Sequence, residues 1–296
     1  MITARITAIR AVYFLSARWY TKPKERTVET VRETIMQLLG QTNTVGREVL
    51  CFGEMDSTNT YLKQLALTGA ADGTVVIAVH QTAGRGRMDR TFQSPAGKGL
   101  YLSVLLRPEL PPERFLPVTA LAGVAVCNAV ERLCGARPGL KWPNDPVLHG
   151  RKLAGVLTEL VVGEDGKPTI VLGIGINLSQ QAEDFTEDVA AIATSLAAEG
   201  YPVSCEAMAA ALLKELDEMY GDLLRGDLER WLQDYRRDCV NIGKAVQLLR
   251  PDGRREQAEA LGIDEDIGLA VRLADGGEEV IRTGEVSVRG LYGYAE

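Results

Sequence analysis

Two predicted β-strands, residues 74–79 and 99–106, flank a loop rich in glycine and arginine, and this arrangement constrains the fold most. The loop, residues 81–95, reads QTAGRGRMDRTFQSP. Both flanking segments are apolar, which is typical of strands buried inside a sheet. Because ligands tend to bind at loops that a rigid scaffold carries, we expect a binding site where the first strand leads into the loop.

The composition of this loop suits a phosphate or another compact anion. We expect Gly84 and Gly86 to let the backbone turn through positive φ and approach a ligand closely. Arg85, Arg87 and Arg90 supply guanidinium groups, which bind phosphate oxygens in pairs and keep their charge at neutral pH. The loop lacks the G-x-x-x-x-G-K-[ST] spacing, so a solvated basic loop remains the alternative on this feature alone.

Length and charge limit the kinds of protein that this chain can be. Its 296 residues favour one large and one small domain, and 46% of them are hydrophobic. The net charge of -7 argues against a main task of binding nucleic acid, since such domains usually carry a strongly basic face. With only His80 and His149 present, a multi-histidine metal site or a Ser/His/Asp triad is not expected.

The N-terminal residues and the cysteines bear on location. In residues 1–27 the apolar run is broken by Arg5, Arg10 and Arg18 and falls short of the roughly 20 residues of a membrane span. We expect a poorly ordered extension and no membrane association. Five cysteines without a C-x-x-C pair fit a reducing compartment, which favours a cytoplasmic protein with free thiols.

One helix is predicted before the first strand. Apolar residues in 28–39 recur at helical spacing and Gly40 ends the pattern. A DNA-reading module needs about three helices, and there is room here for one. We therefore expect no DNA-binding domain.

A polar cluster follows the predicted strand 48–55. Residues 56–59, with Ser57, Thr58 and Asn59, precede a helical pattern and are typical N-cap residues. They either cap the helix alone or also form a polar socket for a ureido, amide or anionic group.

Two further candidates follow a predicted core helix, residues 115–133. In the KWPND segment, Pro143 stiffens a turn that presents Asn144 and Asp145, which form a simple turn or hold Mg²⁺ together with phosphates. Lys152 enters the next strand, residues 153–162, either as an edge charge or as a cation directed at the same ligand.

The last part of the chain changes its pattern. An amphipathic helix is predicted for residues 205–224, beside the sheet. From residue 243 onward, short strands alternate with turns at even spacing, which predicts a small barrel.

Four motifs, in this order and with similar gaps, resemble those of the biotin protein ligase (biotin-[acetyl-CoA-carboxylase] ligase) family. They are residues 81–95, KWPND at 141–145, RKLAGVLTEL at 151–160 and GIGIN at 173–177. The resemblance implies an α+β fold: a mixed-sheet catalytic domain of the class II aminoacyl-tRNA synthetase-like, biotin-lipoate ligase type, residues 28–239, and an SH3-like barrel, residues 240–296.

The family's activity is the formation of a C–N bond between biotin and a protein. The resemblance implies that biotin and ATP form biotinoyl-5'-AMP with release of pyrophosphate, and that biotin then passes to a lysine of a biotin carboxyl carrier protein. Two unit charges 4 Å apart repel by roughly 4 kcal/mol at an intermediate dielectric, so fixed cations must bring the two anions together. The resemblance implies that Lys152, Arg85 and Arg87 are these catalytic cations.

The resemblance also implies a set of binding residues for biotin, the adenylate and Mg²⁺. Biotin would contact Ser57, Thr58, Asn59 and Gln81, and the adenylate would lie against Gly84, Arg85, Gly86, Arg87 and Arg90. Lys152 would bridge biotin and the adenylate, with Gly155 and Asn177 nearby. Asn144 and Asp145 would lie near the phosphates and the metal.

Two positions depart from the family pattern, and three questions stay open. Asp89 stands where members commonly carry Gly, and Phe92 where they carry Trp, so the loop gains a charge and loses an indole.

A lipoate ligase or acyltransferase and a biotin-responsive DNA repressor are the alternative functions. A homodimer also remains open.

Overall fold

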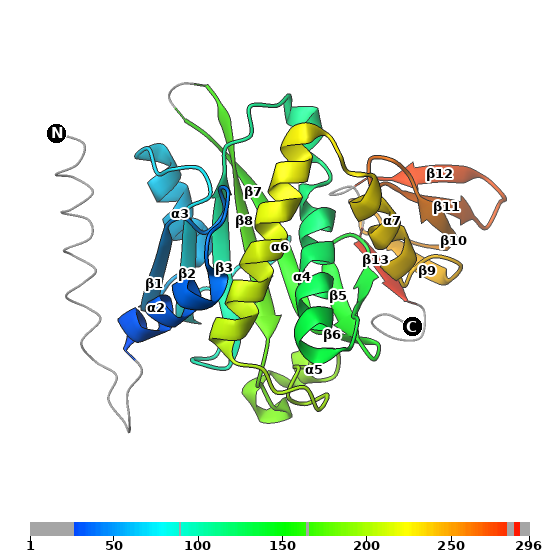
Figure 1. The fold of residues 1–296 in the computed structure, drawn as a ribbon. Coiled ribbons are helices and arrows are strands. Elements are labelled where there is room, and N and C mark those ends of the chain that lie inside the picture. The colour runs from blue at the N-terminus through cyan, green and yellow to red at the C-terminus, as the bar shows by residue number, and fades with distance from the viewer. Residues whose placement is uncertain (1–26, 89, 164–165, 283–286, 291–296) are drawn as a thin grey trace.

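The computed structural model describes residues 27–88, 90–163, 166–282 and 287–290, the last of these for the backbone only. Most of the expected N-terminal extension, and Asp89, therefore lie outside the described residues. The chain forms a mixed five-stranded sheet with helices on both faces and a smaller antiparallel sheet near the C-terminus (Figure 1).

The main sheet has the order β1-β2-β3-β8-β7. The first two strands are parallel and the other neighbours are antiparallel. The strands are β1 (Val49–Met55), β2 (Val75–Gln81), β3 (Gly99–Leu106), β7 (Ala154–Val162) and β8 (Pro168–Asn177). Each strand predicted for this part of the chain is confirmed, with bounds that agree to within two residues.

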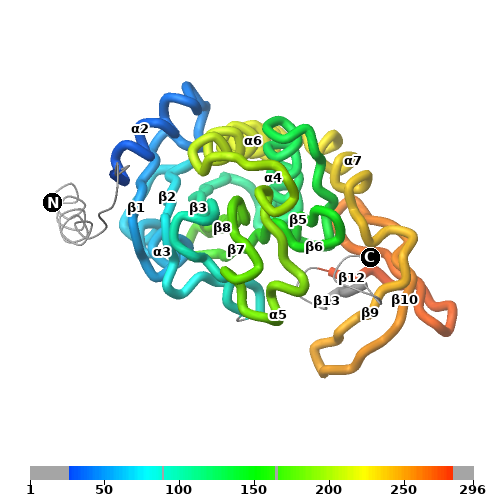
Figure 2. The backbone as a smooth tube through the Cα atoms, turned by 90° about the horizontal axis from the view of Figure 1, so that it is seen from below, coloured from blue at the N-terminus to red at the C-terminus, as the bar shows by residue number. Residues whose placement is uncertain are grey.

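The two faces of this sheet pack against different helices (Figure 2). On β2, Val75 and Ile77 belong to the larger core, while Val76 and Ala78 belong to a second core on the other face, as the alternation of side chains along a strand requires. The larger core includes α2 (Val28–Leu39), α4 (Val118–Cys134) and α6 (Cys205–Arg225); α3 (Thr58–Leu67) covers the second.

The helix predicted for residues 115–133 is confirmed as the central core helix, α4. A 3-10 turn, η1 (Pro112–Phe115), precedes it, and the stretch Pro112–Cys134 is long and apolar enough to cross a membrane. Most of this stretch is buried inside the fold, as expected of a helix that is apolar on nearly all sides. Helix α6 lies against α2 and α4 and touches the sheet through β3.

The C-terminal strands form a five-stranded antiparallel sheet of order β12-β11-β10-β9-β13. Its strands are β9 (Ala245–Leu249), β10 (Arg255–Ile263), β11 (Leu269–Leu273), β12 (Glu278–Ile281) and β13 (Ser287–Gly290). The predicted strands are confirmed here, and the small sheet fits an SH3-like domain.

The pattern-based reading missed several short elements. Helix α7 (Glu229–Asp238) buries Trp231 and Tyr235, a pair four residues apart that signals one helical face. The others are a three-stranded sheet of β4 (Gly139–Lys141), β5 (Asp145–Leu148) and β6 (Arg151–Lys152), and the segment with η2 (Ala182–Asp184) and α5 (Glu187–Ala190).

Candidate functional site

A pocket of about 890 Å³ lies between the start of α3, the arginine loop, the glycine-rich strands β7 and β8, and the KWPND turn. It gathers residues that are far apart in the sequence. Of the predicted site residues, it is lined by Ser57, Thr58, Asn59, Gln81, Arg85, Gly86, Arg87, Arg90, Asn144, Asp145, Lys152, Gly155 and Asn177.

The expectation of positive φ at Gly84 and Gly86 was wrong. In this loop, among its described residues, Met88 has the positive φ, at 54°. The glycines are needed for close approach, because a Cβ on Gly84 would lie 2.3 Å from the carbonyl oxygen of Phe92, and one on Gly86 would lie 3.1 Å from that of Arg90. Gly84 lines a separate hollow of about 410 Å³ on the other side of the loop.

Glycines on β7 and β8 leave room for the Phe92 ring and for the pocket. A Cβ on Gly175 would lie 2.4 Å from the Phe92 ring, so a larger residue there would displace the aromatic side chain. The ring also packs edge-on against Tyr101, with 6.3 Å between the centroids. Phe92, which stands where family members commonly carry Trp, thus keeps an aromatic face at the pocket.

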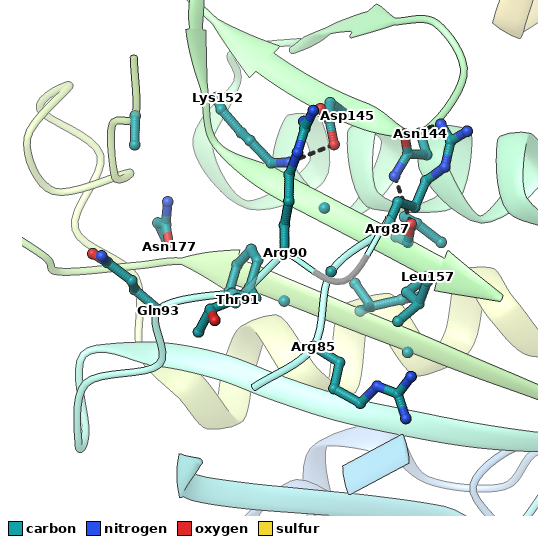
Figure 3. Close-up of a pocket in the computed structure, with 18 of the residues that line it drawn as sticks. Arg85, Arg87, Arg90, Thr91, Gln93, Asn144, Asp145, Lys152, Leu157 and Asn177 are labelled. Carbon is teal, nitrogen blue, oxygen red and sulfur yellow. Dashed lines mark hydrogen bonds and ion pairs between the residues drawn. The ribbon is translucent and has the colours of Figure 1, made fainter. Parts of the chain in front are cut away.

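Several cations meet at one end of the pocket (Figure 3). Lys152 Nζ lies 2.6 Å from Asp145 Oδ1, Arg87 Nη1 donates to Asn144 Oδ1 at 3.2 Å, and Arg90 points toward the first pair. Burial lowers the pKa of the Arg87 guanidinium, although the charge of Asp145 opposes this shift. The guanidinium is thus partly desolvated, which strengthens its attraction to an anion.

Arg85 points away from this group (Figure 3). Its Nη2 lies 3.4 Å from Glu159 Oε1 on β7, near the start of α3. The predicted catalytic cations therefore divide into two groups, with Arg87 and Lys152 at one end and Arg85 at the other.

The polar cluster at the start of α3 caps the helix and also lines the pocket. The Ser57 hydroxyl accepts a hydrogen bond from the backbone N–H of Thr60 and so caps the helix. The backbone N–H of Thr58 donates to Gln81 Oε1 at 2.8 Å, and Gln81 Nε2 donates to Ser94 at 3.0 Å. These bonds fix polar groups at the pocket wall.

Two asparagines of the site are largely occupied by bonds within the protein. Asn177 Nδ2 donates to the Thr194 carbonyl at 2.9 Å and its Oδ1 accepts from Gln180. Asn144 Nδ2 donates to the carbonyl of Val156 at 2.7 Å. Both side chains therefore hold the pocket frame together.

The KWPND turn is held in place by the C-terminal part of the chain. The backbone N–H of Trp142 donates to Asn241 Oδ1 at 2.7 Å, and the indole N–H donates to the Ile267 carbonyl at 2.8 Å. The buried hydroxyl of Tyr235 donates to the Pro143 carbonyl at 3.1 Å. These partners are about 100 residues away in sequence, and no local pattern indicated them.

The oxygen ligands near Lys152 are too few to hold Mg²⁺ by themselves, so they fit Mg²⁺ only when substrate phosphates supply the remaining ligands. Within the described parts of the chain, no three His, Cys, Asp or Glu side chains form a cluster. Asp145 and Asp188 line the pocket and Asp145 contacts Lys152, and Mg²⁺ commonly takes one or two carboxylates together with substrate phosphates.

The segment between β8 and α6 forms a wall that the sequence did not predict. The Gln93 side chain donates to Thr186 Oγ1 at 2.7 Å and accepts from its backbone N–H at 3.1 Å. Further along, Lys152 N–H donates to the Ile192 carbonyl. The pocket residues missed from the sequence include Thr91, Gln93, Trp142, Leu157, Thr186 and Ala193. The segment between β8 and α6 has no sustained periodicity that would signal a site.

The pocket thus joins Lys152 and Arg87 at one end to fixed amides and hydroxyls at the start of α3. Residues 52–177 match the model of the Biotin/lipoate A/B protein ligase family. The chain belongs to this family, within its biotin protein ligases.

Relatives and solved structures agree with this assignment. The chain is 35% identical to the biotin--[acetyl-CoA-carboxylase] ligase of Mycobacterium tuberculosis, over 81% of this chain and 88% of that protein. It is 33% identical to the bifunctional ligase/repressor BirA of Bacillus spizizenii, over 80% of this chain and 73% of that protein. The biotin protein ligase of Aquifex aeolicus, solved with biotin and ATP, superposes with a TM-score of 0.70 at 28% identity, covering 82% and 99% of the two chains.

Proposed function

We propose that this protein is a biotin protein ligase. It joins biotin to ATP to form biotinoyl-5'-AMP and pyrophosphate, and then transfers biotin to a lysine of a biotin carboxyl carrier protein. The observation that carries this proposal is the placement of Lys152, Arg87 and Arg90 at one end of a pocket whose other end is lined by the polar start of α3.

The first step requires two anions to meet. A carboxylate oxygen of biotin attacks the α-phosphorus of ATP, and pyrophosphate leaves with the electrons of the broken P–O bond. Lys152 and Arg87 offset the repulsion between the carboxylate and the phosphate and stabilise the charge of the transition state. Arg90, which points toward the same end, adds to this positive field.

The second step transfers the acyl group. The uncharged amine of the carrier lysine attacks the acyl carbon of the mixed anhydride, AMP leaves, and the nitrogen loses a proton to form the amide. Water would hydrolyse the anhydride, so the loop and the wall at Thr186 must shield it until the amine arrives. The glycines Gly84 and Gly86 let the loop backbone pack closely enough to do this.

Mg²⁺ would be held by Asp145 and the phosphates of ATP, and would neutralise part of the phosphate charge when bound. We further propose that the protein acts in the cytoplasm and does not bind DNA, since its net charge of -7 argues against a nucleic-acid partner. Within residues 27–88, one helix, α2, precedes β1, whereas a DNA-reading module of the helix-turn-helix type needs about three. Whether the protein acts as a homodimer is a question for sizing in solution.

The test is a calorimetric titration of the purified protein with biotin and with lipoate, each with and without ATP and Mg²⁺. Biotin should bind and lipoate should not, and avidin-detectable transfer to the carrier should require ATP. Tighter binding of lipoate would favour the lipoate ligase alternative. Specific binding to an operator in a gel shift would favour the repressor.

A further inference from the structure

Glu159 joins three residues that come from two other segments of the chain. Its Oε2 accepts from Asn59 Nδ2 at 2.9 Å, and its Oε1 lies 3.0 Å from Lys63 Nζ and 3.4 Å from Arg85 Nη2. Asn59 and Lys63 belong to α3, Arg85 to the loop and Glu159 to β7. Asn59 and Arg85 line the pocket, whereas Glu159 is not among the described side chains that line it.

The carboxylate of Glu159 determines which end of the Asn59 amide faces Ser103 and Gly173, of which Gly173 lines the pocket. An ionised carboxylate can only accept, so the NH₂ group of Asn59 must face it. The amide oxygen then faces the other way, where the hydroxyl of Ser103 donates to it at 2.5 Å. This oxygen also lies close to β8, because a Cβ on Gly173 would be 2.2 Å from it.

We propose that Glu159 is a positioning residue of the ligand site: its carboxylate fixes the Asn59 amide with the oxygen toward the pocket, where it accepts an N–H group of the ligand. This inference rests on the proposed function, in which the ureido group of biotin supplies that N–H. Glu159 acts through Asn59 and does not itself touch the ligand.

The charge of Glu159 is maintained by its neighbours. Burial alone would raise the pKa of this carboxyl, but hydrogen bonds from Asn59 and Lys63 and the charges of Lys63 and Arg85 hold it below its ordinary value. The side chain is therefore ionised at neutral pH and can serve as an acceptor only.

The substitution Glu159→Gln changes one oxygen to an NH₂ group at nearly constant volume. Lys63 and Arg85 attract the remaining oxygen, since both contact the same side of the carboxylate. The new NH₂ group then faces the NH₂ group of Asn59, and the Asn59 amide must rotate to avoid two opposed donors. Its donor end would turn toward the pocket and repel an N–H of the ligand.

The test compares biotin binding by calorimetry in wild type, Glu159→Gln, and the exchange variant Glu159→Gln with Asn59→Asp. In the exchange variant, the carboxylate at position 59 accepts from the new amide at position 159 and again presents an oxygen to the pocket, at unchanged net charge. We expect Glu159→Gln to raise the Kd for biotin by about tenfold or more, with the KM for ATP within about twofold, and the exchange variant to recover to within about threefold of wild type.

Three outcomes would overturn the inference, each measured in protein that unfolds cooperatively. The first is a Kd for biotin of Glu159→Gln within about twofold of wild type, and the second is an exchange variant that binds biotin no better than Glu159→Gln. The third is a rise in the KM for ATP as large as the rise in the Kd for biotin. If Glu159→Gln does not fold, the exchange variant is measured in its place. A folded exchange variant whose Kd for biotin is about thirtyfold or more above that of wild type contradicts the proposed role. The Lys214→Met variant, at an exposed lysine of α6 that bonds to the Leu38 carbonyl, is the control for loss of a positive charge away from Glu159, and its Kd should stay within about threefold.

A ligand-free measurement separates this inference from the proposed function. Nuclear Overhauser contacts of the Asn59 NH₂ protons should go to Glu159 in wild type and to Ser103 in Glu159→Gln. Contacts that stay the same in both proteins overturn the inference. Failure of wild type to bind biotin would overturn the proposed function, while these contacts would still test the orientation of Asn59.

Discussion

Lys152 Nζ lies 2.6 Å from Asp145 Oδ1, and both side chains line the pocket. Asp145 lies on β5 and Lys152 on β6, which are adjacent strands of the three-stranded sheet. The backbone of Lys152 forms hydrogen bonds with Ile192 and Thr194. The lysine is thus kept at the cationic end of the pocket by a carboxylate and by two backbone hydrogen bonds, which limits the motion needed when a ligand binds.

Replacing Lys152 should slow formation of the adenylate. We expect Lys152→Met to lower the rate of pyrophosphate release by roughly 10²- to 10³-fold, because it removes a cation placed where two anions react. Lys167→Met, at a lysine whose side chain is 70% exposed beside Glu109, should leave the rate within about twofold. Equal rates for the two variants would contradict the catalytic role of Lys152.

Arg87 should retain the adenylate. Its guanidinium bonds to Asn144 and is partly desolvated, so Arg87→Ala removes a partly buried cation from the phosphate end of the pocket. We expect release of biotinoyl-5'-AMP to accelerate by about tenfold, measured as its loss from preloaded enzyme. The matched control is Arg254→Ala, at a 78% exposed turn position, and unchanged leakage in Arg87→Ala would mean that this side chain has another role.

Gly84 should be required for loop packing. Gly84→Ala would bring a Cβ to 2.3 Å from the Phe92 carbonyl oxygen and 2.7 Å from the Ser94 hydroxyl, so the loop must shift. We expect about 1–3 kcal/mol of destabilisation in urea unfolding, together with weaker ATP binding. Gly262→Ala, where a Cβ meets nothing within 4 Å, should change stability by less than about 1 kcal/mol.

Asn241 should connect the C-terminal sheet to the site. Its Oδ1 accepts the backbone N–H of Trp142, and Asn241→Ala leaves this buried donor without its partner. We expect a loss of about 1–3 kcal/mol in stability. The KM for ATP should also rise, because the same turn carries Asn144 and Asp145. A stability loss with an unchanged KM would show that the turn keeps its geometry without this bond.

Buried thiols should make the stability depend on alkaline pH. Burial raises the pKa of Cys239 to about 11 and also raises the pKa of Cys127, and neither thiol forms a disulfide. Because the unfolded thiols ionise at about pH 8.5, the folded state loses stability as the pH rises above about 8.5. Aromatic disulfide reagents at pH 8 should react with these thiols slowly in native protein and fully in urea. Fast reaction in native protein would contradict their burial.

Several features of the fold follow from local patterns in the sequence. The helix at residues 28–39, its stop at Gly40 and the cap at Ser57 were all predictable, since periodicity and capping depend on neighbours in the chain. The five cysteines, all within the described residues, form no disulfide, as their scattered positions indicated. The pocket residues were found because four short motifs carry most of them.

The sequence by itself thus determined the longer helices and the strands of the two five-stranded sheets, the family and the chemical character of the loop. Only the tertiary structure decided that Arg85 pairs with Glu159, that Asn241 and Ile267 hold Trp142, and that Thr186 meets Gln93. The positive φ at Met88, in place of the glycines, is likewise set by how the whole loop packs. The physical reason is distance along the chain: helices, strands and caps arise from contacts between near neighbours, whereas these pairs form only when the sheet brings remote segments together.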